Sequence, residues 1–279
     1  MKLALDFRAA FNLDLAEALR SRWVLFSTFV TCLLAAVFIF VGMRESTVMG
    51  FTGMGRALLS FSHTLLLILP LLALAATGQV MSQAREDGTF ELLFSHPITP
   101  WRFFAAVSVV RYLVIFVPLL FWMVGMAAYD HMAASGTIQW SFLLRVLLLS
   151  AALLWCYVAL GLTVSIFVRN QARAMIYLLL IWALSAAFID FGIIALMLRW
   201  KLQPEVVFVL AVLNPLQAAR MALLAGINTD LAVLGPVGHF LGARLGASWL
   251  LVIGVAWPVV VGCVAWMTSF WSLRHDDLL

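Results

Sequence analysis

Long apolar stretches alternate with short polar connections along this chain. A helix needs about 20 apolar residues to cross the hydrocarbon core of a bilayer. Six stretches meet that requirement, at 23–42, 59–82, 103–128, 141–168, 174–198 and 247–271. Backbone polar groups inside lipid must be hydrogen-bonded within their own segment, so we expect six transmembrane helices. The pattern therefore predicts an all-α integral membrane protein, with a single transmembrane domain over residues 1–279.

Apolar side chains also recur with helical spacing before the first long stretch. The predicted apolar face holds Phe7, Phe11, Leu15, Ala18 and Leu19, and polar residues fill the opposite face. This pattern is typical of an amphipathic helix in the membrane interface, ending where the chain turns inward at Trp23. Charged residues from Asp6 to Arg22 leave no uninterrupted apolar core of the kind that a cleavable signal peptide needs.

The connection between the fifth and sixth stretches, from about 199 to 246, is itself largely apolar. Its segment "PEVVFVLAVLNP" is too short to span a bilayer. Asn214 and Pro215 form a helix start, with Asn as N-cap and Pro as first helical residue, and Gly226 marks a C-terminal stop. We expect two short re-entrant helices in the outer leaflet; the alternative is a plain extracellular cap packed on the spans.

Composition and charge support a membrane protein and suggest its orientation. Only 11% of the residues are charged and 65% are hydrophobic, whereas a soluble domain has about 25% charged residues. The basic amino terminus and the dense "RNQAR" connection favour the cytoplasmic side for both termini. The small net charge of +4 reflects loop orientation in this interpretation, and we expect membrane lipids and no nucleic acid as partners.

The polar hairpin "AREDGTFELLFSHPIT", residues 84–99, separates the second and third stretches. Gly88 would end the preceding helix, Thr89 would cap a short helix from 90 to 95, and Pro97 would end it. Glu91 would lie in its first turn, where the helix dipole favours an acid. Charged side chains and bulky apolar ones would then face the cytoplasm together: Arg85, Glu86, Asp87, Phe90, Leu92, Leu93 and Phe94. Either this is a solvated loop with ordinary caps, or it docks on a partner.

This hairpin resembles the acid–x–Gly-Thr–apolar–Glu-Leu-Leu pattern, followed by proline, of type-two ABC export permeases. The matching positions are Glu86, Gly88, Thr89, Glu91, Leu92 and Pro97, and Asp87 fills the variable position. The resemblance implies that the hairpin is a coupling helix that docks on a separate cytoplasmic ABC ATPase. It also implies a homodimer in a bacterial inner membrane, an interfacial amino-terminal helix and outer re-entrant helices.

Within that family, "VLNPLQAARMALLAG" is similar to a signature of one branch, here Asn214, Pro215 and Arg220. Transporters of that branch serve the maturation of the copper enzyme nitrous-oxide reductase. The resemblance implies a periplasmic accessory protein as the partner of this outer region. An Asn-Pro followed by Arg also occurs in other relatives, so the export of a lipid, drug or glycan remains the alternative.

The chain lacks the motifs of an enzyme. A phosphate-binding loop needs a lysine after glycine, and neither Lys2 nor Lys201 follows one. We expect no catalytic residue, no metal site and no cofactor in this chain, with ATP and Mg²⁺ held by the partner ATPase. Its three cysteines lie in apolar segments without metal-ligand spacing, and we interpret them as core hydrophobes.

Two ionisable residues, Arg111 and Asp190, lie within predicted spans. Either they line a path or pair across helices, or they reach the inner and outer interfaces with their polar ends. A stand-alone secondary transporter would need more such charges and an internal repeat, neither of which is visible. Glycines within the spans, at 161, 254 and 262, predict close helix contacts.

Overall fold

The computed structural model describes residues 2–21, 25–33, 36–37, 53–88, 100–132, 140–188, 191–192, 195, 199, 204–226 and 246–275. Regular structure in these residues is entirely helical. The amino-terminal helices are α1 (Lys2–Arg20), α3 (Gly53–Thr77), α4 (Val80–Glu86) and α6 (Pro100–Met132). They are followed by α7 (Trp140–Phe167), α8 (Gln171–Ala183), the π-helical η1 (Leu184–Phe188), α10 (Pro204–Leu213), α11 (Pro215–Leu224) and α13 (Gly246–His275).

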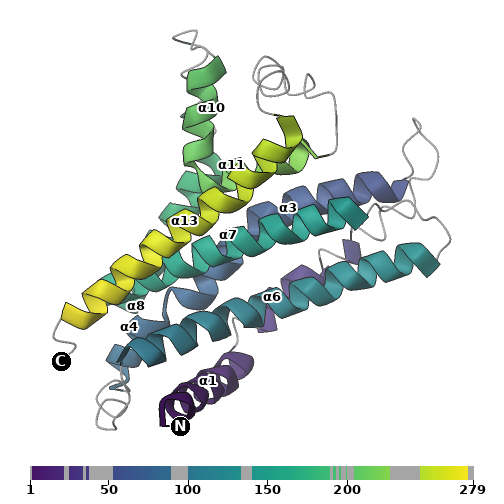
Figure 1. Cartoon of the computed structure of the whole chain (residues 1–279). Helices are drawn as coiled ribbons and strands as arrows, with labels where there is room; N and C mark the ends of the chain where they lie inside the picture. The colour runs from purple at the N-terminus through teal and green to yellow at the C-terminus, as the bar shows by residue number, and fades with distance from the viewer. Residues whose placement is uncertain are drawn as a thin grey trace.

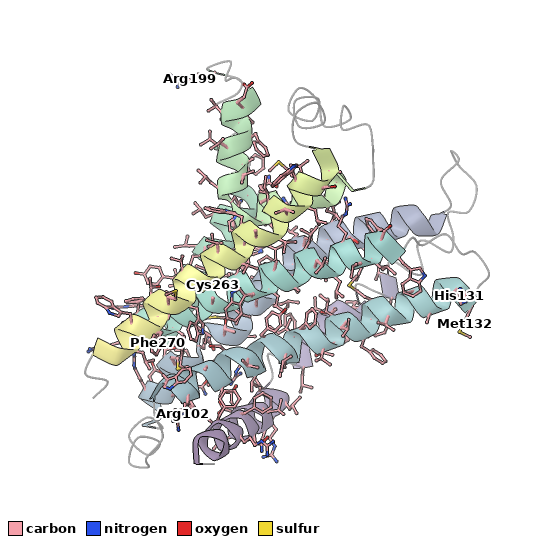
Figure 2. All side chains as sticks on the ribbon, in the orientation of Figure 1. Arg102, His131, Met132, Arg199, Cys263 and Phe270 are labelled. Atoms are coloured by element: carbon pink, nitrogen blue, oxygen red, sulfur yellow. The ribbon has the colours of Figure 1, made fainter. Side chains whose placement is uncertain are left out.

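The long helices run side by side between two ends of a bundle (Figure 1). One end holds α4, the beginning of α6 and the carboxyl-terminal end of α13, while the opposite end holds the beginnings of α3 and α7. Side chains at these ends mark the same division: Arg102 and Phe270 lie at the first, and His131 and Met132 lie at the second (Figure 2). The α10 helix points away from the bundle above α11.

Among the described residues, four helical segments are long and apolar enough to cross a membrane: Phe61–Glu86, Trp101–Gly125, Trp140–Phe167 and Gly246–Leu273. They correspond to the predicted second, third, fourth and sixth spans. The predicted first span, 23–42, is helical at 25–33 and 36–37 and otherwise lies outside the described residues. The described part of the predicted fifth span contains the apolar helix Gln171–Ala187, which is shorter than a full span as far as it is described. The described residues thus show four of the expected spans, and a bent helix pair would raise the number of candidate spans to five. The count of six stays a prediction.

That bent pair consists of α10 and α11, whose segments Glu205–Leu213 and Pro215–Leu224 are bent by 118° relative to each other. The two short helices joined by Asn214-Pro215 were expected from the sequence. Asn214 is the N-cap of α11, and Pro215 follows at its start. The helix pair is confirmed, whereas its re-entrant placement in the outer leaflet stays a prediction.

The predicted second span, 59–82, is helical over most of its length, and the structure shows a turn within it that the sequence did not indicate. The helix begins at Gly53, breaks after Thr77 and resumes as α4 from Val80 to Glu86. The turn at Gly78 lies against Leu178 of α8 so closely that a Cβ atom at position 78 would overlap that side chain. Ser165 of α7 compensates for the break, since its Oγ accepts hydrogen bonds from Met81 N at 2.8 Å and Ser82 N at 3.2 Å.

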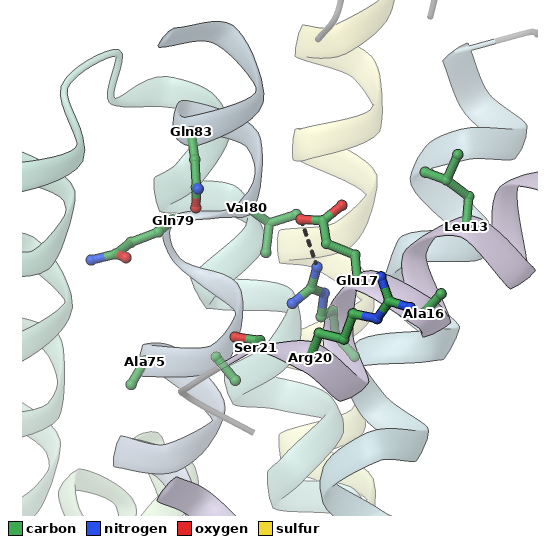
Figure 3. A pocket seen from close by; sticks show the side chains of 11 residues that line it. Leu13, Ala16, Glu17, Arg20, Ser21, Ala75, Gln79, Val80 and Gln83 are labelled. Carbon is green, nitrogen blue, oxygen red and sulfur yellow. Dashed lines mark ion pairs between the residues drawn. The ribbon is translucent and has the colours of Figure 1, made fainter. Parts of the chain in front are cut away.

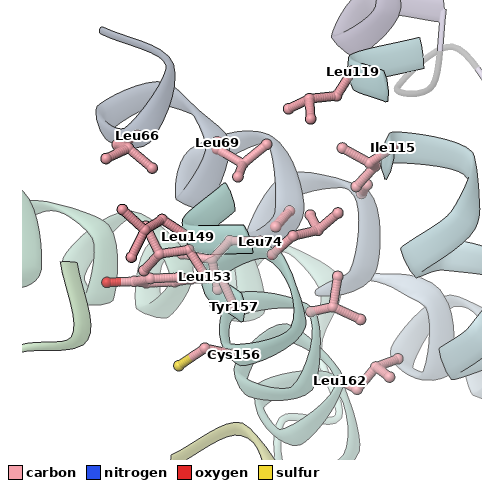
Figure 4. Close-up of a cluster of buried hydrophobic side chains, with 14 of the residues drawn as sticks. Leu66, Leu69, Leu74, Ile115, Leu119, Leu149, Leu153, Cys156, Tyr157 and Leu162 are labelled. Carbon is pink, nitrogen blue, oxygen red and sulfur yellow. The ribbon is translucent and has the colours of Figure 1, made fainter. Parts of the chain in front are cut away.

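The core is centred on α7, which packs against α3, α6, α11 and α13. Fully buried side chains converge around it, as Figure 4 shows for Leu69, Leu119, Leu153, Cys156 and Tyr157. Burial of each large apolar side chain contributes about 1.5–3 kcal/mol in water. Inside a bilayer this contribution comes instead from packing, because lipid tails are as apolar as leucine.

The three predicted contact glycines do lie where helices approach closely. A Cβ atom at Gly262 of α13 would lie 2.9 Å from Cys156 Cα of α7. At Gly254 it would lie 3.1 Å from the Ala218 carbonyl oxygen of α11, and at Gly161 it would overlap the Thr77 side chain. The prediction of close packing at glycine is therefore confirmed.

The α1 helix packs against α6, and its buried face differs from the predicted one. Ala18 is fully buried, whereas Leu19, assigned to the apolar face, is 58% exposed. Asp14, assigned to the polar face, is only 3% exposed. Asp14 is buried because Arg111 of α6 lies opposite it.

Candidate functional site

The end of α4 leads into the hairpin that the sequence singled out. The Asp87 N–H bonds to the Gln83 carbonyl at 2.9 Å, and the Gly88 N–H bonds to the Arg85 carbonyl at 3.2 Å. Gly88 has φ of 67°, in the left-handed region that glycine adopts without steric cost. Gly88 thus ends the helix as predicted.

Two consecutive residues of α4 hold the ends of two other helices. Arg85 Nη1 donates to the carbonyl oxygen of Ile166, in the last turn of α7, at 2.7 Å. Glu86 Oε1 accepts from the backbone N–H of Gln171, the first residue of α8, at 3.2 Å. Terminal backbone groups of a helix lack internal partners, and the helix dipole favours a cation at its C-terminus and an anion at its N-terminus. Arg85 and Glu86 meet both preferences.

A third contact joins the break between α3 and α4 to the same place. Gln171 Nε2 donates to Gln79 Oε1 at 3.0 Å. We call this set, Gln79, Arg85, Glu86, Ile166 and Gln171, the cytoplasmic junction, after the side of the membrane that the sequence predicts for it. It binds α4 to the connection between α7 and α8, residues more than 80 positions away along the chain.

The predicted coupling residues are thus only partly placed. Arg85 is half-buried, and Glu86 and Asp87 are exposed. The sequence led us to expect Arg85 and Glu86 to face the cytoplasm, but it did not indicate their contacts with α7 and α8. Asn170, the side-chain N-cap of α8, was a usable signal for a helix that begins at 171. The other predicted coupling residues, Thr89, Phe90, Glu91, Leu92 and Pro97, lie outside the described residues.

The second polar feature is a buried ion pair between α1 and α6. Arg111 Nη2 lies 2.8 Å from Asp14 Oδ1 and 3.7 Å from Glu17 Oε1. Arg111 is 5% exposed. Of the two roles considered from the sequence, pairing across helices is the one observed. Asp190 lies outside the described residues.

Burial sets the protonation behaviour of the Asp14 carboxyl group. Desolvation raises its pKa above the usual value, and the attraction and hydrogen bond of Arg111 oppose this rise without cancelling it. A buried ion pair contributes little net stability, but removing one partner leaves an uncompensated charge. Asp14 and Arg111 therefore fix where α1 lies on α6 more than they add to stability.

The third feature is the elbow between α10 and α11. Asn214 is 2% exposed, and its Oδ1 accepts from the Leu216 N–H at 3.1 Å. Its Nδ2 donates to the carbonyl oxygen of Ser185, in η1, at 2.6 Å. Trp257 Nε1 of α13 donates to the Leu213 carbonyl at 3.2 Å. The buried Asn214 side chain holds the start of α11 against η1, while the Arg220 side chain is half-buried on α11.

The helical stretch α8–η1 connects the two polar sites. Its first residue, Gln171, belongs to the cytoplasmic junction, and its Ser185 carbonyl holds the elbow. Between them, Trp182 Nε1 donates to the Leu67 carbonyl of α3 at 3.2 Å. The helical stretch α8–η1 is therefore hydrogen-bonded to the junction at one end and to the elbow at the other.

In the part of the chain that the structure describes, no group of three or more His, Cys, Asp or Glu residues is arranged to hold a metal ion. Cys156 is buried, Cys32 is half-buried and Cys263 is exposed, and all three are free thiols. The chemistry of this site is thus hydrogen bonding and charge pairing between helices.

Comparison with known proteins identifies the architecture. The sequence profile described as ABC-2 family transporter protein matches residues 9–277. The chain belongs to the ABC-2 transporter family. As an ABC-2 protein it is a multi-pass membrane permease subunit, and an ABC permease works with a partner ATPase subunit.

Two curated relatives within this family cover most of the chain. A probable ABC transporter permease protein NosY from Stutzerimonas stutzeri is 25% identical over 252 residues, 88% of this chain and 90% of the relative. The protein of the same name from Pseudomonas aeruginosa strain PAO1 is 25% identical over 246 residues, 85% of this chain and 88% of the relative. The similarity to NosY agrees with the resemblance seen in the sequence.

Proposed function

We propose that this ABC-2 permease transmits movement from a cytoplasmic ATPase to its outer side. The ATPase docks on the hairpin around residues 89–99, and its ATP-driven movement reaches α4 through Gly88. The observation that carries this proposal is the cytoplasmic junction, where Arg85 and Glu86 of α4 hold the adjoining ends of α7 and α8.

The route from the junction to the outer side follows α8–η1. Displacement of α4 pulls on Gln171, and the Ser185 carbonyl passes the displacement to Asn214 at the α10–α11 elbow. The break at Gly78 permits α4 to tilt without moving the whole of α3. Coupling between distant sites needs an element that both sites bias, and α8–η1 is that element here.

The biological setting follows the similarity to NosY. The chain acts as a homodimer in a bacterial inner membrane with both termini cytoplasmic, and its outer region acts on a periplasmic accessory protein. The purpose is the maturation of the copper enzyme nitrous-oxide reductase. A mechanical role agrees with the scarcity of metal-ligating clusters among the described residues.

Reconstitution tests the proposal directly. The permease and its ATPase are placed in liposomes with and without the periplasmic partner, and ATP-dependent movement of copper, lipid or drug is measured. We expect ATP hydrolysis that responds to the periplasmic partner, without movement of these compounds by the partner-free complex. Transport by the partner-free complex would favour a true exporter instead.

Thiol labelling tests the orientation on which the proposal depends. A cysteine at position 90 in a cysteine-free variant should react with an impermeant reagent only after the cells are opened. Labelling from outside intact cells would place the hairpin on the wrong side for an ATPase.

A further inference from the structure

A cavity of about 610 Å³ lies between α1, the α3–α4 break and α6, next to the cytoplasmic junction. Figure 3 shows Glu17 and Arg20 of α1 on one side and Gln79, Val80 and Gln83 on the other. The cavity contains groups of both charges beside apolar walls. It shares Gln79 with the cytoplasmic junction, but its charged groups, Glu17, Arg20 and Arg111, take no part in the transmission route described above.

The apolar walls come from small and medium-sized side chains. Ala16 and Leu13 of α1 face Ala75 and Ala76 of α3 across the cavity. Leu13 is 52% exposed on the surface of the protein. For a helix at the membrane interface, such a surface meets acyl chains. An amphipathic ligand therefore has an apolar exit from the cavity along Leu13.

The cationic part of the cavity consists of Arg111 and Arg20. Arg111 lines it, and its Nε atom, buried, has no hydrogen-bond partner among the described residues. Asp14 Oδ2 beside it is likewise buried without a described partner. Buried polar atoms without a partner are rare in proteins. The ion pair thus leaves one donor and one acceptor without a hydrogen bond among the described residues. Arg20 also lines the cavity and is exposed, so its guanidinium group is accessible to an incoming anion.

The anionic part is Glu17. Its Oε1 lies 3.7 Å from Arg111 Nη2, which is too long for a hydrogen bond. The Glu17 side chain is 65% exposed, so its carboxylate oxygens retain the capacity to accept from another donor. A ligand with a phosphate and a nearby N–H cation would meet both kinds of group.

We propose that this cavity binds the headgroup of phosphatidylethanolamine. The phosphate lies between Arg20 and Arg111, the ammonium donates to Glu17, and the acyl chains leave along Leu13 into the inner leaflet. Phosphatidylglycerol lacks the cation for Glu17. Phosphatidylcholine carries a quaternary ammonium without N–H donors. The cavity therefore prefers phosphatidylethanolamine over both.

Photo-crosslinking of the intact permease in nanodiscs tests this binding without an ATPase. Phosphatidylethanolamine with a photoreactive acyl chain is included in phosphatidylcholine discs, and labelled peptides are mapped by mass spectrometry. We expect labelling of the α1 and α3 peptides around Leu13 and Ala75. Excess unlabelled phosphatidylethanolamine should compete, and phosphatidylglycerol should not.

Variants separate the cavity from general lipid contact. Arg20→Ala should reduce this labelling about tenfold, the effect of losing one hydrogen bond to a charged group. Ala16→Phe should reduce it by filling the cavity. Arg8→Ala removes an exposed arginine of the same helix that does not line the cavity, and it should leave labelling unchanged.

Three outcomes would overturn the proposal. The first is equal competition by phosphatidylglycerol. The second is an equal effect of Arg8→Ala and Arg20→Ala. The third is competition by soluble phosphoethanolamine as strong as that by the lipid, which would assign the cavity to a soluble phosphate compound. Because no ATPase is present, none of these results depends on the proposed transmission of movement.

Discussion

The side-chain amide of Asn214 donates to the backbone carbonyl of Ser185 at 2.6 Å, joining the α10–α11 elbow to the π-helical end of α8–η1. π-helical turns are rare and occur often at functional sites. The same side chain caps α11 through the Leu216 N–H. One buried residue thus determines both where α11 begins and which helix the elbow contacts.

Loss of this residue should destabilise the protein more than loss of an ordinary cap. Asn214→Ala removes the cap and leaves the Ser185 carbonyl unpaired, so we expect a loss of about 1–3 kcal/mol. The matched control is Asn170→Ala, which removes the exposed cap of α8 at Arg173 N and should cost about 1 kcal/mol or less. Thermal unfolding followed by tryptophan fluorescence measures both; equal effects would show that the Ser185 bond contributes nothing.

Close packing of α7 and α13 depends on Gly262. Gly262→Ala would place its Cβ atom 2.9 Å from Cys156 Cα, so the two helices would have to separate. We expect a cost of about 1–3 kcal/mol. Gly125→Ala is the control, because no atom lies within 4 Å of a Cβ there. It should be neutral or stabilise by about 0.5–1 kcal/mol. If the two variants change the free energy of unfolding by the same amount, the contact between α7 and α13 at Gly262 is looser than the structure indicates.

The Asp14–Arg111 pair gives a pH dependence with a definite sign. Because burial raises the pKa of Asp14, the folded state binds this proton more tightly than the unfolded state. Stability therefore rises as the pH falls through that raised pKa towards the usual pKa of an aspartate. Arg111→Ala removes the opposing attraction, so the rise on mild acidification should become larger. Asp14→Asn should lack this component. Unfolding midpoints at neutral and mildly acidic pH, compared among the three proteins, measure it; a smaller rise in Arg111→Ala would contradict the assignment.

The contacts of α4 with α7 and α8 should affect the ATPase partner. Partly exposed ionic contacts contribute at most about 1 kcal/mol. Glu86→Gln and Arg85→Ala should therefore lower the ATPase rate of the assembled complex several-fold without abolishing it. Arg8→Ala removes an exposed charge of α1 outside the hairpin and the junction, and it serves as the control. Wild-type rates in both junction variants, with assembly intact, would remove the junction from the proposed route.

The left-handed conformation of Gly88 makes a separate prediction for the hairpin. Gly88→Val puts a β-branched residue at φ of 67°, at a cost of about 1–2 kcal/mol, and should lower the ATPase rate by misdirecting the hairpin. Gly88→Asn should be tolerated better, because asparagine adopts this conformation more readily. Equal rates in the two variants would show that the direction of the chain at Gly88 does not matter for coupling.

Local features of the sequence predicted the local structure well. Span length and apolar composition indicated four of the membrane-crossing helices. Gly88 and the Asn214-Pro215 pair marked helix boundaries, because backbone conformation and capping depend on neighbouring residues. Gly161, Gly254 and Gly262 indicated close contacts, since a glycine within a span usually serves packing.

Long-range contacts were not predictable in the same way. The helical periodicity of α1 assigns Asp14 to the polar face, and only the position of Arg111 on α6 explains its burial. The break at Gly78 lies within an apolar stretch, and the Ser165 hydroxyl that satisfies the freed N–H groups is distant in sequence. The bonds of Arg85 and Glu86 to α7 and α8 depend likewise on how the helices pack.

Arg85 contacts the carbonyl end of one helix, and Glu86 contacts the amide end of the next. The order of these two residues in the sequence therefore decides whether α4 is attracted to both helix ends. Combining Arg85→Glu with Glu86→Arg preserves amino-acid composition, isoelectric point and hydropathy, yet it sets each charge against the helix end that repels it. Any comparison of such permeases that counts charges in loops would score the two chains as identical. Only the order of the two residues distinguishes a chain whose α4 binds α7 and α8 from one whose α4 is repelled by them.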